Sequence, residues 1–253
     1  MENRYHIGID DTHGAKYVIL PGDPGRVEKI AEHLKNPQFY NQRREYTTWI
    51  GELSGERVLV MSTGMGGAST AIAVEELHQT GVRNFIRIGT CGGMAEAVVG
   101  GDVVIALGTI RMEGTTKEYV PIEFPAIANH DVTSALIKAA EKFAYRWHCG
   151  IVHCKDSFYG EHNPDRIPVG YELKEKWNAW IMAGCLASEM ESAALFIICQ
   201  ILGARAGCVL STVWNQERER KGLANPHVLD TSNAINVAVE ACKILIEQDR
   251  QKI

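Results

Sequence analysis

The sequence lacks both an excess of charge of one sign and any long apolar run. Its formal net charge is -5 over 253 residues, so no overall basic field exists to hold a nucleic acid, and no local basic patch appears. No segment approaches the length of a membrane span, and the first residues carry no apolar stretch typical of a secretory signal. We therefore expect a cytoplasmic protein with neither nucleic-acid nor membrane partners.

Cysteine pairs, linkers and repeats are also missing. The seven cysteines are scattered without a Cys-x-x-Cys pair, and several lie in apolar stretches where a thiol behaves as a small hydrophobic side chain. Disulfides and a zinc site are both disfavoured. Because no stretch rich in proline, glycine or serine divides the chain, residues 1–253 are predicted to form one domain.

Short apolar runs alternate with helical patterns along the whole chain. This alternation is typical of an α/β protein built around a central sheet. Residues 191–202 leave almost no polar face, so that helix is predicted to be buried. The predicted strands are 17–20, 58–62, 85–88, 103–107, 150–154 and 207–212, and the predicted helices are 26–34, 69–79, 133–143, 172–182, 191–202 and one that begins after Asp230 or Thr231.

The run from Leu20 to Arg26, L-P-G-D-P-G-R, leads from a predicted strand into a predicted helix. Its glycines let backbone amides approach an anion, the helix N-terminus adds partial positive charge, and Arg26 offers a forked donor, so the run suits phosphate. An ordinary strand-to-helix turn with a surface arginine explains the same residues. By itself the run favours this plainer explanation.

A second glycine-rich run, S-T-G-M-G-G-A-S-T-A-I, covers residues 62–72. Three glycines in four positions imply close approach of the backbone to another group. The run lacks the third spaced glycine of a dinucleotide-binding fingerprint and the lysine of a P-loop. Alone it does not identify a ligand.

Arg87 lies inside an apolar predicted strand that breaks at Gly89-Thr90. Burying an arginine is costly unless it meets an anion or a carboxylate. An internal acid such as Glu76 could be that partner. The threonine and glycines that follow favour a bound ligand instead.

Extended to Glu76-Leu77, the second run reads S-T-G-M-G-G-A-S-T-A-I-x-x-x-E-L. In this form it resembles the signature of the nucleoside phosphorylase family, which includes uridine phosphorylases and hexameric purine nucleoside phosphorylases. The resemblance implies that family's fold, a single domain in which a mixed, partly barrel-like β-sheet is flanked by α-helices. It also implies phosphate as a co-substrate and no organic cofactor. Further matches, in chain order, are His6-Ile7-Gly8, Arg44 to Trp49, Phe158-Tyr159 and Ser188 to Ser192.

The resemblance also assigns residues to phosphate and ribose. Ribose would lie against Met190 and Glu191, with Glu189 nearby and His6 reaching the 5′-hydroxyl from an adjacent subunit. Ser188 and Glu191 equally fit a helix capping box, which explains the same acids without a ligand. Arg26, Arg87 and Glu191 would be the catalytic residues, and phosphate would be held by Gly22, Arg26, Arg87, Thr90 and the neighbouring subunit's residue that matches Arg44.

The segment expected to bind the base departs from the uridine phosphorylase pattern. Those enzymes usually read uracil with a glutamine and, two residues later, an arginine, whereas here Glu161 takes the glutamine's place and Arg166 lies five positions further on. A carboxylate accepts from uracil N3–H but cannot donate to a carbonyl oxygen. Either His162 supplies the donor, or the base is one that presents donors, such as guanine, hypoxanthine or cytosine. The predicted base-binding residues are Phe158, Glu161, His162, Arg166, Val213 and Trp214.

The expected reaction converts a nucleoside, uridine above all, and phosphate into a free base and ribose 1-phosphate. The strand that ends near Trp214 lacks the serine-aspartate pair with which hexameric purine enzymes protonate N7, which disfavours the purine branch. A purine-type phosphorylase or a nucleosidase of the same fold is the alternative. A non-catalytic nucleoside-binding protein is the second alternative.

Family members assemble as hexamers, built as trimers of dimers, with sites that use residues of two subunits. The resemblance therefore implies a homo-oligomer in which His6 and Arg44 act across an interface. In some members a monovalent cation lies between subunits beside the residues that match Glu45 and Ser69. A potassium ion at these residues is a further expectation.

Overall fold

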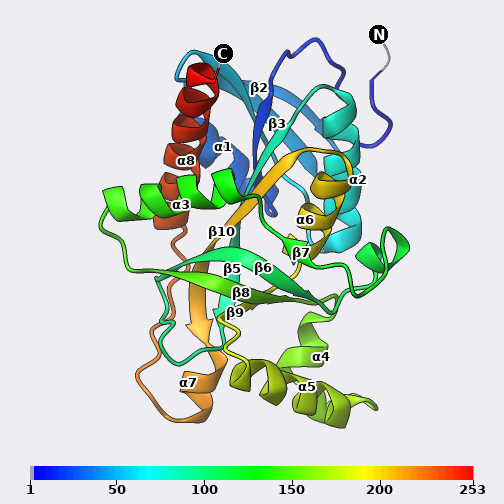
Figure 1. Ribbon diagram of the computed structural model, residues 1–253, viewed down its shortest axis with the longest axis vertical. Helices are drawn as coiled ribbons and strands as arrows, with labels where there is room; N and C mark the ends of the chain where they lie inside the picture. The colour runs from blue at the N-terminus through cyan, green and yellow to red at the C-terminus, as the bar shows by residue number, and fades with distance from the viewer. Residues whose placement is uncertain (1–2, 253) are drawn as a thin grey trace.

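A mixed β-sheet of ten strands forms the centre of the computed structural model, which describes residues 3–252 (Figure 1). It contains both parallel and antiparallel pairs, as in many α/β proteins that carry antiparallel strands beside a parallel core. The strands are β1 (Tyr17–Pro21), β2 (Lys35–Arg43), β3 (Tyr46–Leu53), β4 (Glu56–Met61), β5 (Asn84–Gly93), β6 (Val103–Arg111), β7 (Ala126–Ile127), β8 (Trp147–Cys154), β9 (Ala187–Glu189) and β10 (Arg205–Asn215).

One half of the sheet closes on itself. The strand order is β2-β3-β4-β1-β5-β9-β8-β6-β10, and the short β7 pairs with β6. Because β10 pairs with β5 as well as with β6, the strands β5, β9, β8, β6 and β10 form a closed barrel. The predicted fold, a single α/β domain with a mixed and partly barrel-like sheet, is confirmed.

Helices cover both faces of the open half of the sheet (Figure 1). Successive side chains of β1 point to opposite faces, so Val18 packs in one core with α2 and α6 while Ile19 packs in the other with α1, α3 and α8. The remaining helices α4, α5 and α7 lie at the barrel end. The α-helices are α1 (Val27–Ala31), α2 (Gly67–Gln79), α3 (His130–Lys142), α4 (Phe158–His162), α5 (Gly170–Met182), α6 (Ser192–Ile201), α7 (Gln216–Arg220) and α8 (Ser232–Gln251).

The predicted strands and helices are all present, with shifted ends. The predicted helix 26–34 is shorter, since Pro24–Arg26 forms a separate 3-10 turn before α1. The helix predicted to be buried is α6, whose residues from Ser192 to Cys199 are buried. The sequence did not predict the β2-β3 hairpin, the short strands β7 and β9, or the short helices α4 and α7. Most of β2 is exposed at the edge of the sheet, so its sequence shows little apolar signal.

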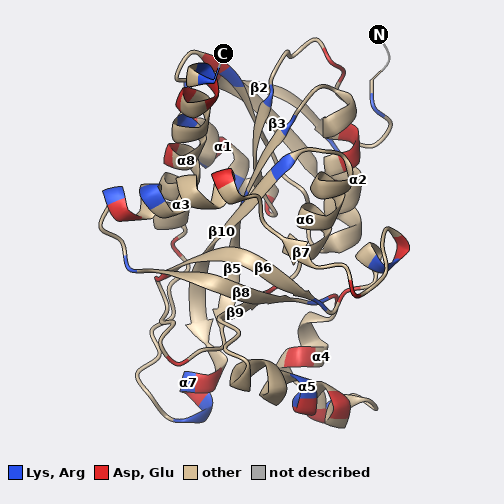
Figure 2. Cartoon of the chain, in the orientation of Figure 1, with Lys and Arg blue, Asp and Glu red and all other residues tan. Residues whose placement is uncertain are grey.

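Charged residues are distributed over the outer surface rather than gathered in one region. Figure 2 shows acidic and basic residues mixed along α3, α5, α7 and α8. Within residues 3–252, no helix is both long enough and apolar enough to cross a bilayer.

Candidate active site

A cavity of about 800 Å³ opens where β1, β5 and β10 end. These strands run parallel, so their carboxyl ends meet at one edge of the sheet, the usual place for a ligand in such folds. The cavity is lined by Gly22, Asp23, Pro24, Arg26, Glu45, Gly64, Met65, Ser69, Arg87, Gly89, Thr90, Cys91, Gly92, Lys155, Phe158, His162, Ser188, Glu189, Met190, Glu191, Val213 and Trp214.

Arg87, on β5, is the buried cation at the centre of the cavity wall. Its Nη2 pairs with Oε2 of Glu191, and its Nε lies 3.4 Å from Oε2 of Glu189. Burial alone would lower the pKa of Arg87, but these two carboxylates outweigh it and raise the pKa, so the guanidinium stays charged. Glu76, the internal acid that the sequence offered as a partner, instead accepts hydrogen bonds from the backbone N–H groups of His6 and Ile7.

Two arginines that line the cavity carry buried guanidinium donors without partners in residues 3–252. Nη1 of Arg87 and Nη1 of Arg26 are buried, and neither makes a hydrogen bond within the described chain. At Gly22 an added Cβ would lie 3.2 Å from the Gly64 carbonyl oxygen, which is a tight contact, and would occupy the space 3.8 Å from Nη1 of Arg87. Buried donors without partners are costly, and a phosphate oxygen would satisfy them.

Glu191 is held by the second glycine-rich run. The N–H of Gly66, which precedes α2 and has a φ of 89°, donates to Oε1 of Glu191 at 2.6 Å. Residues with a side chain rarely adopt this backbone conformation. The group that the glycine-rich run 62–72 approaches closely is therefore the carboxylate of Glu191, beside the cavity.

The predicted capping box between Ser188 and Glu191 is wrong. Ser188 lies in β9, and Glu189 caps α6 instead, because its carboxylate accepts from the backbone N–H groups of Glu191 and Ser192 at 2.9 and 3.0 Å. A negative charge here also complements the positive end of the helix dipole. Glu189 thus has a structural role in addition to its contact with Arg87.

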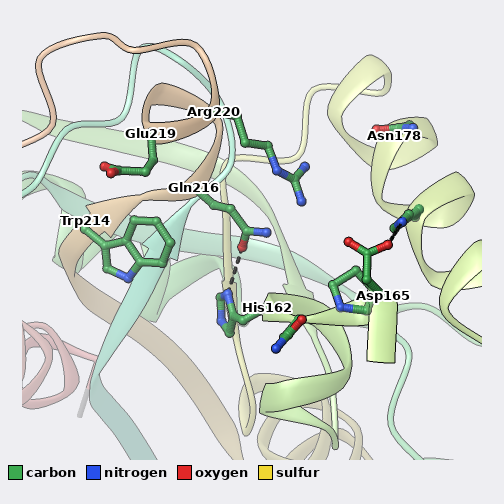
Figure 3. A pocket seen from close by; sticks show the side chains of 10 residues that line it. His162, Asp165, Asn178, Trp214, Gln216, Glu219 and Arg220 are labelled. Carbon is green, nitrogen blue, oxygen red and sulfur yellow. Dashed lines mark hydrogen bonds and ion pairs between the residues drawn. The ribbon is translucent and has the colours of Figure 1, made fainter. Parts of the chain in front are cut away.

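Aromatic side chains gather at the other end of the cavity. The ring centroids of Phe158 and His162 are 4.3 Å apart, and Trp214 lies 6.0 Å from His162. A neighbouring pocket of about 510 Å³ shares His162 and Trp214 with the main cavity (Figure 3). Together with Val213 these rings form an apolar wall suited to the flat face of a base.

His162 is fixed by Gln216. Its Nδ1 lies 2.7 Å from Oε1 of Gln216, which can only accept, so Nδ1 carries the hydrogen (Figure 3). Burial is the main reason that the pKa of His162 is lowered, which keeps the ring neutral near pH 7. With Gln216 oriented in this way, Nε2 is left as the acceptor on the ring. The role of His162 as a donor to a base carbonyl stays a prediction.

Two predicted base-binding residues lie outside the cavity lining. Glu161 is buried beneath α4, where its Oε1 lies 3.9 Å from Nε2 of His153, and the exposed Arg166 stacks over the Tyr159 ring at 5.4 Å. The short helix α4 turns successive side chains to different sides, so Phe158 and His162 reach the cavity and Glu161 faces the interior. The structure therefore places Glu161 and Arg166 outside the lining of this cavity, and their roles at the base stay predictions.

His6 and Arg44 also lie outside the cavity of their own chain. Nδ1 of His6 lies 2.6 Å from Oε1 of Glu76, and the exposed Arg44, with a φ of 57°, places its guanidinium 5.9 Å from the centre of the Tyr5 ring. Both were expected to act on a neighbouring subunit. Their roles there stay predictions.

The two residues expected beside a cation do lie together. The Ser69 hydroxyl donates to Oε1 of Glu45 at 2.7 Å and also contacts the Thr63 carbonyl oxygen. Carboxylate, hydroxyl and carbonyl oxygens are hard ligands of the kind a potassium ion takes. The ion itself stays a prediction.

Lys155 is a buried, charged residue of the cavity lining that the sequence analysis did not name. It follows β8 directly, is only 3% exposed, and its Nζ donates to the Ser188 hydroxyl at 2.6 Å. Burial lowers its pKa, against the opposing attraction of Glu189 and Glu161. The sequence could have indicated Lys155 as a site residue, because it follows the carboxyl end of a predicted strand and ligands usually bind at that edge of a sheet.

Within an α/β fold, the cavity combines buried cationic side chains with an apolar, aromatic end. The sequence matches the model of the phosphorylase superfamily over residues 16–248. It is 54% identical to a uridine phosphorylase of Treponema pallidum, over 97% of this chain and 95% of the relative, and 39% identical to a uridine phosphorylase of Escherichia coli, over 96% and 98%. A guanosine phosphorylase of Halorubrum lacusprofundi is 36% identical over 85% of each chain. The chain therefore belongs to the phosphorylase superfamily and is an enzyme.

The burial of Glu161 generates a prediction about stability. Burial raises the pKa of its carboxyl above the usual 4.5, and Lys155 and Lys176 only partly oppose this. The neutral His153, whose pKa burial lowers to about 3, adds no compensating charge. The folded protein therefore binds the proton of the Glu161 carboxyl more tightly than the unfolded chain does. The stability that this proton contributes is complete below pH 4.5 and is lost as the pH rises through the pKa that Glu161 has in the folded protein.

The side chain in Glu161→Gln is neutral at every pH. We therefore expect the Tm of this variant minus the Tm of the wild type to increase as the pH rises from about 4 to about 7. Calorimetry at a series of pH values measures the difference. Glu175→Gln, which removes an exposed carboxyl of α5, is the control. A Tm difference that stays constant or shrinks with rising pH would contradict the conclusion that burial disfavours the ionised carboxylate of Glu161.

Proposed function

We propose that this protein is a uridine phosphorylase, which transfers the ribosyl group of uridine to inorganic phosphate and releases uracil. Two relatives that match nearly the whole chain carry that name. The observation that carries the proposal is the pair of unpartnered guanidinium donors, from Arg26 and Arg87, beside the buried carboxylate of Glu191. We further propose that it acts in the cytoplasm, as the sequence analysis predicts.

The proposed reaction needs no covalent enzyme intermediate. The C1′–N1 bond of uridine breaks, the base leaves with the electron pair, and a phosphate oxygen bonds to C1′. The sugar passes through a cationic, oxocarbenium-like state. Catalysis then consists of holding the phosphate near C1′ and stabilising opposite charges on the sugar and on the base.

The charges in the cavity suit these steps. Arg26 and Arg87, with Gly22 and Thr90, would hold the phosphate dianion, since each arginine keeps donors that no other group uses. Glu191 would accept hydrogen bonds from the ribose hydroxyls and stabilise positive charge on the sugar. Its pairing with Arg87 fixes its position before the substrate binds.

The ribose and base would occupy the remaining parts of the cavity. Met190 lies beside Glu191 on the cavity wall and would contact the sugar. Phe158, Val213 and Trp214 would pack against the faces of the base, with Nε2 of His162 accepting from a ring N–H.

A guanosine phosphorylase is the second candidate, because one relative at 36% identity carries that name. A nucleosidase of the same fold and a non-catalytic nucleoside-binding protein are the remaining candidates. Base release from uridine, guanosine, inosine and cytidine, each with and without phosphate, separates them. A hydrolase ignores phosphate and a binding protein releases no base.

Removal of the Arg87 guanidinium should abolish phosphate-dependent turnover. Arg87→Ala deletes one preorganised charged contact, so we expect kcat to fall by about 100-fold to 1,000-fold or more. Uracil release at saturating phosphate measures the effect, and circular dichroism establishes that the variant is folded. Arg250→Ala, which removes a surface arginine paired with Glu56, is the control. A near-normal rate in Arg87→Ala would refute the phosphate assignment.

We also propose a homo-oligomer, a hexamer built as a trimer of dimers, in which His6 and Arg44 complete the neighbouring subunit's site. The support is that both residues lie outside the cavity of their own chain and that Arg44 is exposed. A dimer would then be the smallest active unit.

Two inactive variants should complement each other in a mixed assembly. When Arg44→Ala and Arg87→Ala chains associate at random, about a quarter of the sites combine an intact Arg87 with an intact Arg44 from the neighbour. We expect co-expressed, doubly tagged assemblies to regain about that share of wild-type activity. Each variant assembled alone is the control. If mixing restores nothing although mixed assemblies form, Arg44 does not act across the interface.

A further inference from the structure

Lys155 is a buried cation for which the reaction described above has no role. Its Nζ lines the same cavity as Phe158 and His162 and lies 5.8 Å from the centre of the Phe158 ring. It is therefore located at the aromatic end of the cavity. Its backbone N–H donates to the Glu189 carbonyl oxygen at 3.2 Å, which anchors the residue beside the ribose-side acids.

The ammonium group of Lys155 has spare donors. An ammonium carries three N–H donors, and within residues 3–252 only one of them makes a hydrogen bond, to the Ser188 hydroxyl at 2.6 Å. Ser188 is also within 3.2 Å of Nδ1 of His153, so the hydroxyl is held from two sides. This arrangement fixes the position of Nζ and leaves it with two donors for a ligand.

The base end of the cavity needs such a donor. Uracil presents carbonyl oxygens, which must meet donors when they are buried. Nδ1 of His162 is engaged by Oε1 of Gln216, Glu161 lies outside the cavity lining, and Arg166 lies at the surface. The other arginines of the cavity, Arg26 and Arg87, are assigned to the phosphate in the proposed reaction, and Arg87 pairs with Glu191.

We propose that the Lys155 ammonium donates a hydrogen bond to a carbonyl oxygen of the base and stabilises the negative charge that the base acquires as the C1′–N1 bond breaks. The leaving electron pair delocalises from N1 onto the carbonyl oxygens, where a buried positive charge has its largest effect. Lys155 keeps its proton, and the released uracil anion takes one from water. This inference rests on the proposed phosphorolysis of uridine.

A purely structural role for Lys155 makes a different prediction. In that case its charge only balances the buried carboxylates of Glu189 and Glu161. Loss of the charge would then disturb the cavity equally for every substrate. The dependence of the rate on the leaving group distinguishes the two roles.

The test compares uridine with 5-fluorouridine, whose base is the stronger acid and leaves more readily. Wild type, Lys155→Met, Lys155→Arg and the surface variant Lys142→Met are assayed by single-turnover cleavage at saturating phosphate. Lys142 lies on α3 and pairs with Glu240 at the surface. Turnover of uridine by the wild type is measured first, because its absence would reject the proposed function itself rather than the role of Lys155.

We expect Lys155→Met to slow uridine cleavage by about 100-fold but 5-fluorouridine cleavage by only about 10-fold, because the fluorinated base needs less stabilisation. Lys155→Arg, which keeps a charged donor, should keep the wild-type ratio of the two rates, as should Lys142→Met. Equal losses on both substrates would overturn the proposal. So would an unchanged ratio with a raised KM for phosphate, since Lys155 would then bind the phosphate. If Lys155→Met does not fold, Lys155→Gln carries the same comparison.

Discussion

The site depends on the burial of Arg87 between two carboxylates and an open cavity. A guanidinium that is 4% exposed must be neutralised, and Glu189 and Glu191 provide that charge. The pairing leaves Nη1 without a partner among the described residues, 3.8 Å from where a Cβ on Gly22 would lie. The same contact thus stabilises the fold and prepares a site for an anion. It also locks Glu191 into the position from which it would hold a ribose.

The site is assembled from distant stretches because the topology brings their ends together. Three parallel strands, β1, β5 and β10, end at one edge of the sheet, and β9 carries Glu189 to the same place. The glycine-rich run before α2 closes over this edge, where Gly66 binds Glu191. The closure of the barrel through β10 therefore determines which residues can share the cavity.

The sequence predicted the architecture well and the site in part. Apolar runs located the strands, and the family resemblance named most of the cavity-lining residues, including Arg26, Thr90 and Trp214. It did not predict that Arg87 pairs with Glu191, because residues so far apart in the chain meet only through the β5–β9 pairing. The inward orientation of Glu161 and the burial of Lys155 depend on how α4 packs, and periodicity over five residues carries no such information.

The central claim is that Arg87 and Arg26 hold a phosphate beside Glu191. A crystal structure of the protein grown with phosphate tests it most directly. The account predicts a tetrahedral anion within hydrogen-bond distance of Nη1 of both arginines, in the space next to Gly22, with the pairing of Arg87 and Glu191 intact. An anion bound elsewhere, or no anion in the cavity at saturating phosphate, would contradict it.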